Sequence, residues 1–312
     1  DIRIATKNSW IGMAGPAMIE GGGLGKFDPK EIGPTDVQKN NGVIDYVAEN
    51  EKDATNIAKK ILSYFQGEIK NWKADDQKKL SNIMPKDRRW SYPVRDIIRI
   101  ISDIEQFTEI RPDYGKGIVS CFIRIEGKPF GLLANDSQHL GGAIDSEGAD
   151  KASSFIEMCS EYGLPIISLV DTPGFMVGPD SEKEGAVRRM SNLFKIGSKV
   201  KVPLTAIFLR KGYGLGAQAM VGGSLHEPVY TAAWPTGEFG AMGLEGAVKL
   251  GFKKELEKIE DNSKREELFN SLVEKLYDKG KAIEAAAHLE IDAVINPSET
   301  RSVILKSQKA FV

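Results

Sequence analysis

The sequence has few of the side chains that carry most enzyme chemistry. Its 312 residues include three histidines and two cysteines, and the cysteines are far apart with no Cys-x-x-Cys pair. The Gly-x-Ser-x-Gly, His-Glu-x-x-His and P-loop motifs are also absent. These absences argue against a triad hydrolase, a zinc peptidase and a P-loop nucleotidase. The isolated cysteines predict reduced thiols and no metal site.

The chain also lacks an excess of charge and long apolar runs. Lys and Arg number 42 against 44 Asp and Glu, a net charge of −2, whereas nucleic-acid binders normally carry a basic excess on one face. No apolar run approaches the roughly 18 residues of a membrane helix, and we expect no signal peptide. We therefore expect no nucleic-acid or membrane partner, and a location in the cytoplasm or, in a eukaryote, in the mitochondrial matrix.

Glycine is the residue in excess, with 32 in the chain, or about 10% against an average near 7%. The glycines gather beside apolar runs in four places, at 12–25, 141–142, 174–178 and 212–223. Such positions usually mark tight turns, or backbone that another group must approach closely.

Short apolar segments alternate with segments of helical periodicity. The pattern predicts strands at 2–5, 117–125, 129–134, 164–171, 202–209 and 229–233, and helices at 51–65, 149–162, 183–200, near 216, and at 244–259, 264–279 and 281–289. Strands that alternate with helices favour an α/β fold with largely parallel strands buried on both faces. The polar stretch 66–92 predicts a linker or arm, and the residues before it look too few to form their own core.

The segment 207–220 combines a buried strand, a Gly-x-Gly-x-Gly turn and the start of a helix. Backbone N–H groups at a helix start are unpaired and can receive a developing negative oxygen, which is an oxyanion hole without side chains. Two alternatives compete with this interpretation. The glycines could serve only close helix–strand packing, whereas the dinucleotide pattern fails because Ala217 stands where the third glycine belongs.

Five motifs occur in an order that resembles the carboxyltransferase (β) subunit of biotin-dependent acyl-CoA carboxylases, of the propionyl-/acetyl-CoA carboxylase type. The resemblance is strong over 94–301 and weaker over 2–65. The motifs are NDSQHLGGAID (135–145), VDTPGFMVGPDSEKEGAVRRMS (170–191), LRKGYGLGAQAM (209–220), AWPTGEFGAMGLEGAV (233–248) and EIDAVINPSETR (290–301).

The resemblance implies a fold and a division of the chain. Each subunit of the family has two crotonase-like domains, each a ββα superhelix with its own oxyanion hole. Residues 1–66 would be a remnant of the N-terminal domain, 67–93 a linker or arm, and 94–312 one complete C-terminal domain on the biotin side. The acyl-CoA oxyanion glycines would lie upstream of Asp1. We therefore expect a truncated subunit with half of each active site and little carboxylase activity by itself.

By position, the resemblance also implies site residues. The backbone N–H groups of Leu215 and Gly216 would form the biotin-side oxyanion hole, where the family often has Gly-Gly-Ala, and Leu215 is expected to alter the pocket wall. Gln218 would tune acyl chain length, although a glutamine on a helix is more often a surface amide. The remaining positions expected around biotin are Gly214, Ala217, Gly174, Phe175, Gly142 and Ala143.

The implied reaction moves a carboxyl group from carboxybiotin to the α-carbon of a short-chain acyl-CoA, without a protein base or a metal. Biotin would be carried by a separate protein or domain. The implied partners are a biotin carboxylase, a biotin carboxyl carrier subunit and further copies of this chain, from dimer to hexamer. Two alternatives are the α subunit of a biotin-dependent decarboxylase of the glutaconyl-CoA type and a non-catalytic fragment or assembly partner.

Overall fold

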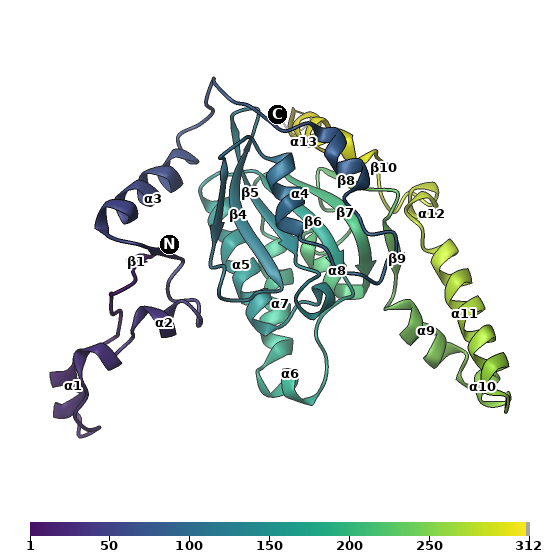
Figure 1. Cartoon of the computed structure of the whole chain (residues 1–312), viewed down its shortest axis with the longest axis horizontal. Helices are drawn as coiled ribbons and strands as arrows, with labels where there is room; N and C mark the ends of the chain where they lie inside the picture. Colours follow the sequence, from purple (N-terminus) through teal and green to yellow (C-terminus); the bar gives the residue numbers. More distant parts are fainter. Residues whose placement is uncertain (310–312) are drawn as a thin grey trace.

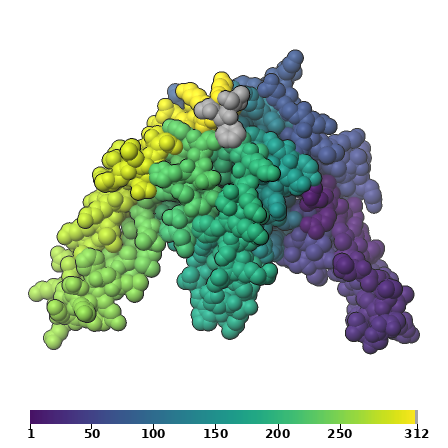
Figure 2. Space-filling view, turned by 180° about the vertical axis from the view of Figure 1, so that it is seen from behind, coloured from purple at the N-terminus to yellow at the C-terminus, as the bar shows by residue number. Residues whose placement is uncertain are grey.

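The computed structural model describes residues 1–309 and has a central sheet with helical extensions on either side (Figure 1). Figure 2 shows these extensions standing away from the central part, with the N-terminal residues on one side and the segment around α10 (Lys253–Glu257) and α11 (Asn262–Lys279) on the other. Within residues 1–309, no helix has both the length and the apolar character needed to cross a membrane.

The central sheet follows the order β10-β8-β7-β6-β5-β4-β3, with β9 paired to the end of β7. The pairs β3–β4 and β4–β5 are antiparallel and the other pairs are parallel, which confirms the expected α/β architecture. The strands are β3 (Phe107–Ile110), β4 (Ile118–Ile125), β5 (Lys128–Asn135), β6 (Ile166–Thr172), β7 (Leu204–Tyr213), β8 (Tyr230–Ala233), β9 (Glu238–Gly240) and β10 (Ala293–Val294).

The hairpin between β4 and β5 illustrates how local sequence builds this sheet. Ile125 pairs with Lys128, so Glu126 and Gly127 form a two-residue loop, and both have positive φ angles of 51° and 77°. Two positive φ angles define a type I′ turn, whose twist matches that of the flanking strands. The strand pair predicted from the sequence is therefore confirmed.

Helices cover both faces of the sheet, and each face has its own hydrophobic cluster. On one face, α5 (Ser146–Glu161) and α7 (Ala186–Gly197) bury Phe155, Ile156 and Leu193. On the other, α4 (Val94–Ile101) and α13 (Thr300–Lys309) bury Ile97 and Ile304. Because both faces are covered, every residue of β6 is buried, which explains why most of its residues are apolar.

One predicted helix is shorter in the structure and another is divided. The helix expected at 183–200 is present as α7, and Gly185 at φ +74° separates it from α6 (Pro179–Lys183), which was not predicted. The helix expected at 244–259 consists of α9 (Leu244–Gly251) and α10, with Phe252 outside helical geometry between them. The other predicted helices after residue 200 are present as α8 (Gly214–Met220), α11 and α12 (Ala282–Ala287).

The first 66 residues form a small two-stranded parallel sheet and three helices. Ile61 and Tyr64 join the same hydrophobic cluster as α5, so this segment packs against the central domain. The elements are β1 (Ile4–Thr6), β2 (Tyr46–Ala48), α1 (Pro16–Gly21), α2 (Thr35–Gln38) and α3 (Glu51–Ser63).

The segment 67–93 lies on the face covered by α4. It has one short 3-10 helix, Gln77–Asn82, and it buries Leu80 and Tyr92 in the cluster of that face. The polar composition that predicts an arm therefore conceals two core side chains. Further 3-10 helices occur at Pro29–Glu31, Leu140–Gly142 and Pro297–Glu299.

Candidate active site

Three of the glycine loops predicted to matter meet at the carboxyl ends of β5, β6 and β7. Ile144, which follows the Gly141-Gly142 turn, forms a parallel bridge with Phe175. Gly216 packs directly on the next loop, because a Cβ on Gly216 would lie 2.6 Å from the carbonyl carbon of Gly174. Ligands favour this edge of parallel sheets, and the structure brings the sequence-predicted residues together there.

The candidate oxyanion hole is the first turn of α8. This helix begins at Gly214, whose φ of +59° turns the chain sharply from β7 into the helix. The N–H groups of Leu215 and Gly216 lie too early in the helix for an intrahelical partner, and within residues 1–309 no side chain and no carbonyl oxygen outside the helices and strands accepts from them. Gly216 is buried, whereas the Leu215 side chain is 62% exposed. The turn thus presents two adjacent free donors beside an exposed apolar side chain.

The loops that surround α8 have little donor capacity of their own. Gly142 donates to His139 and Ala143 donates to Leu140, at N···O distances of 2.9 and 3.1 Å. Gly174 donates to the hydroxyl of Thr172 at 3.1 Å. Gly142, Ala143 and Gly174 can therefore shape the approach to α8, but their N–H groups are already used.

A cavity of about 380 Å³ lies beside α8, between that helix, β9 and α12. Of the predicted site residues, Gly214, Ala217 and Gln218 line it, together with Phe239 and His288. Leu215, Gly216, Gly174, Phe175, Gly142 and Ala143 are not among its lining residues. Gly214, Ala217 and Gln218 therefore form one wall of this cavity, whereas the other six predicted residues lie outside it, in the turn of α8 and the two neighbouring loops.

A buried group of charges lies beneath the turn, and the sequence analysis did not find it. Asp171 is fully buried and accepts hydrogen bonds from Arg210 Nη2 at 2.9 Å and from the backbone N–H of Lys211 at 3.0 Å. Burial lowers the pKa of the Lys211 ammonium, and Asp171 opposes this shift. Charged residues that follow directly on apolar strands were the available signal, but the same pattern is typical of exposed strand ends.

A second buried carboxylate, Glu238, lies on β9 opposite Lys211. It is 1% exposed, and neither of its oxygens has a hydrogen-bond partner within residues 1–309. Arg88 approaches it to 3.7 Å and also bonds Glu245 at 2.7 Å. Burial raises the pKa of the Glu238 carboxyl, and Arg88 opposes that shift. Segment 67–93 thus contributes a charge close to the candidate site.

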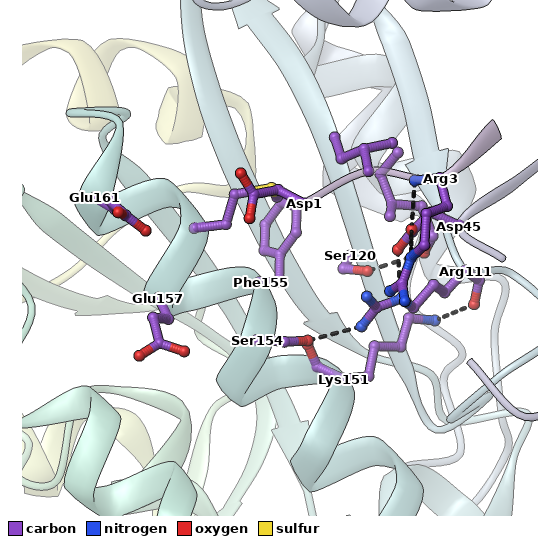
Figure 3. A pocket seen from close by; sticks show the side chains of 13 residues that line it. Asp1, Arg3, Asp45, Arg111, Ser120, Lys151, Ser154, Phe155, Glu157 and Glu161 are labelled. Carbon is purple, nitrogen blue, oxygen red and sulfur yellow. Dashed lines mark hydrogen bonds and ion pairs between the residues drawn. The ribbon is translucent and has the colours of Figure 1, made fainter. Parts of the chain in front are cut away.

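A cavity of about 420 Å³ lies elsewhere, between the N-terminal residues and α5. Figure 3 shows that Arg3 and Arg111 both point toward Asp45, and the Arg111 Nε–Asp45 Oδ1 distance is 2.5 Å. Lys151 Nζ donates to the backbone oxygens of Arg111 and Tyr114, and burial lowers its pKa to about 8. Asp45 and the backbone oxygens of Arg111 and Tyr114 thus bind charged groups that line this cavity.

Within residues 1–309, no group of three or more His, Cys, Asp or Glu side chains is arranged to hold a metal ion. The three histidines, His139, His226 and His288, do not form a nucleophile–base pair with either cysteine, because Cys121 and Cys159 are both fully buried. Among the described residues, the free backbone N–H groups at α8 are the feature best suited to stabilise negative charge.

Comparisons with known proteins found related sequences and structures. The methylmalonyl-CoA carboxyltransferase 12S subunit of Propionibacterium freudenreichii subsp. shermanii is 31% identical over 100% of this chain and 60% of the relative. The methylmalonyl-CoA decarboxylase subunit alpha of Veillonella parvula is 27% identical over 98% of this chain and 60% of the relative. A solved single-chain, multi-domain long-chain acyl-CoA carboxylase superposes with a TM-score of 0.92 at 51% identity, covering 98% of this chain and 30% of that one.

The chain spans between 51% and 66% of the length of the curated relatives that it matches. The family model described as the carboxyl transferase domain matches residues 1–312. That match and the superposition confirm the expected crotonase-like carboxyltransferase fold. The chain belongs to the carboxyl transferase family.

Proposed function

We propose that this chain supplies the biotin side of a carboxyltransferase that moves a carboxyl group between carboxybiotin and an acyl-CoA. The observation that carries the proposal is the pair of free N–H groups of Leu215 and Gly216 at the start of α8. Carboxybiotin, held on a carrier, supplies the carboxyl group. The two N–H groups then hold the negative charge that develops on the ureido oxygen as the carboxyl group leaves, and one such donor is typically worth about 10²- to 10³-fold in rate.

The residues at the turn of α8 are suited to bind the ureido group of biotin. A ureido oxygen needs hydrogen-bond donors and no basic side chain, and the turn of α8 offers backbone donors beside an exposed leucine. Gly214, with its positive φ, lets the chain turn so that both donors lie in the first turn of the helix. Gly174, Phe175, Gly142 and Ala143 form the neighbouring walls in this proposal.

The partners belong to the proposal too. Biotin would arrive on a biotin carboxyl carrier subunit or domain that a biotin carboxylase recharges. The acyl-CoA would be held by the N-terminal domain of a neighbouring subunit, in a homo-oligomer from dimer to hexamer. The proposed division of the chain is a remnant of the N-terminal domain at 1–66, a linker or arm at 67–93 and a C-terminal domain at 94–312.

The acyl substrate has two candidates. The sequence analysis favours a short acyl chain, tuned by Gln218 in the cavity beside α8. The 51% identical structure belongs to a protein named for long-chain acyl-CoA, and this identity favours a longer chain. The direction of transfer also has two candidates, because one relative is named as a decarboxylase subunit.

The experiment that tests the proposal separates the two half-reactions. The purified chain is mixed with carboxybiotin, and the release of CO2 is followed with and without acyl-CoA. We expect the chain to accelerate CO2 release although it forms little carboxylated acyl-CoA by itself. A rate of CO2 release equal to that in buffer would contradict the proposed biotin side, and robust product from acyl-CoA would contradict the expectation of an incomplete subunit.

A further inference from the structure

A chain of buried polar groups crosses the carboxyl ends of three neighbouring strands. Asn135 at the end of β5 accepts a hydrogen bond from the backbone N–H of Asp171 on β6, at 3.1 Å. Asp171 in turn accepts from Arg210 on β7, at 2.9 Å. Asn135, Asp171 and Arg210 are all no more than 3% exposed. One continuous connection therefore links the strands that lead into the three glycine loops.

Asp171 lies where the register between β6 and β7 shifts. Val170 pairs with Phe208, but Thr172 pairs with Gly212, so the ladder is interrupted at the residue between them. The carboxylate takes the backbone N–H of Lys211 at this point, at 3.0 Å. A bulge of this kind changes where the following residues point. The Asp171 side chain therefore fixes the offset between the two strand ends.

Segment 67–93 holds the partner of this carboxylate in place. Arg210 Nη1 donates to the backbone oxygen of Trp90 at 2.7 Å, and its guanidinium lies 5.0 Å from the centre of the Tyr92 ring. Tyr92 is itself anchored, because its backbone N–H donates to the hydroxyl of Ser137 at 3.1 Å. The guanidinium is thus bound on two sides and has a fixed orientation.

Burial of such a pair is poor evidence for stability, because apolar side chains of similar volume often serve a fold as well or better. The positions of the groups point to another role. The Asp171 backbone oxygen lies against Gly142, where a Cβ would collide with it. Lys211, held by Asp171, reaches the backbone oxygen of Gly141 with its ammonium. The contacts of Asp171 and Lys211 thus extend to the Gly141-Gly142 loop, and Asp171 itself lies three residues before Gly174.

We propose that Asp171 is a positioning residue, whose carboxylate, held by Arg210 and by residues 90–92, sets the placement of the α8 turn relative to the loops at Gly142 and Gly174. The catalytic part of this inference rests on the proposed function, because it assumes that the N–H groups of Leu215 and Gly216 act on a ligand. The geometric part is independent of it.

The test replaces the pair without leaving a buried charge alone. Asp171→Asn/Arg210→Met keeps the approximate volumes and removes both charges, and a neutral replacement of this kind is often tolerated. The matched control is Asp103→Asn/Arg301→Met, which removes another buried pair with a 2.8 Å contact. Denaturant unfolding of each variant establishes that it folds.

Two readouts follow. In the first, the amide resonances of Leu215 and Gly216 are compared by NMR in isotopically labelled chain. We expect them to shift or broaden in Asp171→Asn/Arg210→Met and to stay in place in the control. In the second, the rate of CO2 release from carboxybiotin is measured against carboxybiotin concentration. We expect kcat to fall by about 10- to 100-fold, with little change in KM, and the control to retain the unmodified rate.

The outcomes separate the inference from the proposed function. Unchanged Leu215 and Gly216 resonances in a folded Asp171→Asn/Arg210→Met variant would overturn the positioning role. If the unmodified chain does not accelerate CO2 release but the Leu215 and Gly216 resonances move in the double variant, the proposed function fails and the positioning role of Asp171 stands. Should the double variant not fold, Arg210→Lys keeps the charge beside Asp171 but cannot also reach Trp90. The same amide shifts are expected there, and their absence would again overturn the inference.

Discussion

Arg124 on β4 donates from Nη2 to the backbone oxygen of Ser63, the last residue of α3, at 2.6 Å. The same guanidinium donates to the backbone oxygens of Gly67 and Gly127, at 2.8 and 2.5 Å, and lies 5.3 Å from the centre of the Tyr64 ring. The carbonyl groups at a helix end have no intrahelical partner. One buried side chain thus satisfies the end of α3 and joins the first 66 residues to the sheet.

The first prediction concerns the contact between Arg124 and the end of α3. Arg124→Met removes a charged donor from three carbonyl oxygens; those of Ser63 and Gly127 keep the N–H groups of Gln66 and Ile69, whereas that of Gly67 loses its donor. A lost hydrogen bond to a charged group is typically worth about 1.5–3 kcal/mol. We expect residues 63–70 to become much more susceptible to limited proteolysis, while the central domain stays resistant. The control is Arg99→Met, because Arg99 also lies over an aromatic ring, Phe107, but is exposed. Equal cleavage of the two variants at 63–70 would show that Arg124 does not anchor the segment.

The second prediction compares two adjacent glycines. Gly142 has a φ of +90°, and a Cβ there would collide with the backbone oxygen of Asp171, whereas Gly141 has a φ of +64° and space around it. We expect Gly141→Ala to cost about 1 kcal/mol for backbone strain alone and Gly142→Ala at least about 2–3 kcal/mol. Denaturant unfolding measures both free energies. Equal losses of unfolding free energy in the two variants would mean that Gly142 does not pack closely against the backbone oxygen of Asp171 on β6.

The third prediction follows from the two buried thiols. Burial raises the pKa of Cys121 and of Cys159 above the ordinary value of 9.0. An unfolded thiol ionises near pH 9 while the folded one stays protonated, so their contribution to stability is complete below pH 9 and is lost as the pH rises above it. Each thiol should lower the free energy of unfolding by about 1.4 kcal/mol per pH unit in that range.

The matched variant for this prediction is Cys121→Ala/Cys159→Ala. Subtracting its unfolding free energy from that of the unmodified chain cancels the opposite contribution of Lys151, whose lowered pKa of about 8 makes stability rise with pH above that value. The difference should stay constant up to about pH 9 and then fall. A difference that is flat to pH 11 would contradict the burial of the thiols.

The fourth prediction tests the cavity beside α8. Gln218 lines it, so Gln218→Ile should change the ratio of kcat/KM for acetyl-CoA and propionyl-CoA by about tenfold, the usual effect of one methylene in a pocket. The assay uses a subunit completed with an acyl-CoA-binding half from a related carboxyltransferase. Gln66→Ile, at an exposed position outside the cavity, is the control. An unchanged ratio in Gln218→Ile would remove this residue from substrate selection.

Local patterns in the sequence predicted much of this fold. The strand pair at 117–125 and 129–134, the buried strand expected at 164–171 and the helix start near 216 each follow from neighbouring residues, since turn chemistry and apolar runs act over a few positions. Helix α6 was missed because its sequence, PDSEK, has no apolar spacing, and only the structure shows the positive φ of Gly185 that separates it from α7.

The buried charged groups, in contrast, could not be predicted from local sequence patterns. Arg210 and Trp90 lie 120 positions apart in the chain, and no spacing rule connects them. Asp171 lies near the end of the mostly apolar strand β6, where a carboxylate is usually exposed. Its burial depends on the segment 67–93, whose polar composition predicts a solvent-exposed arm. The glycine turn could be located from its motif, but the polar chain beneath it required the tertiary structure.

The most direct test of the account compares Leu215→Pro with Leu215→Ala. Proline at this early helical position removes one N–H group and suits the local backbone, whereas alanine keeps the N–H group and removes only the side chain. If the backbone N–H groups at α8 stabilise negative charge on the ureido oxygen of biotin, Leu215→Pro should lower the rate of CO2 release from carboxybiotin by about 10²- to 10³-fold. Leu215→Ala should retain most of the unmodified rate. Equal rates in two folded variants would contradict the account.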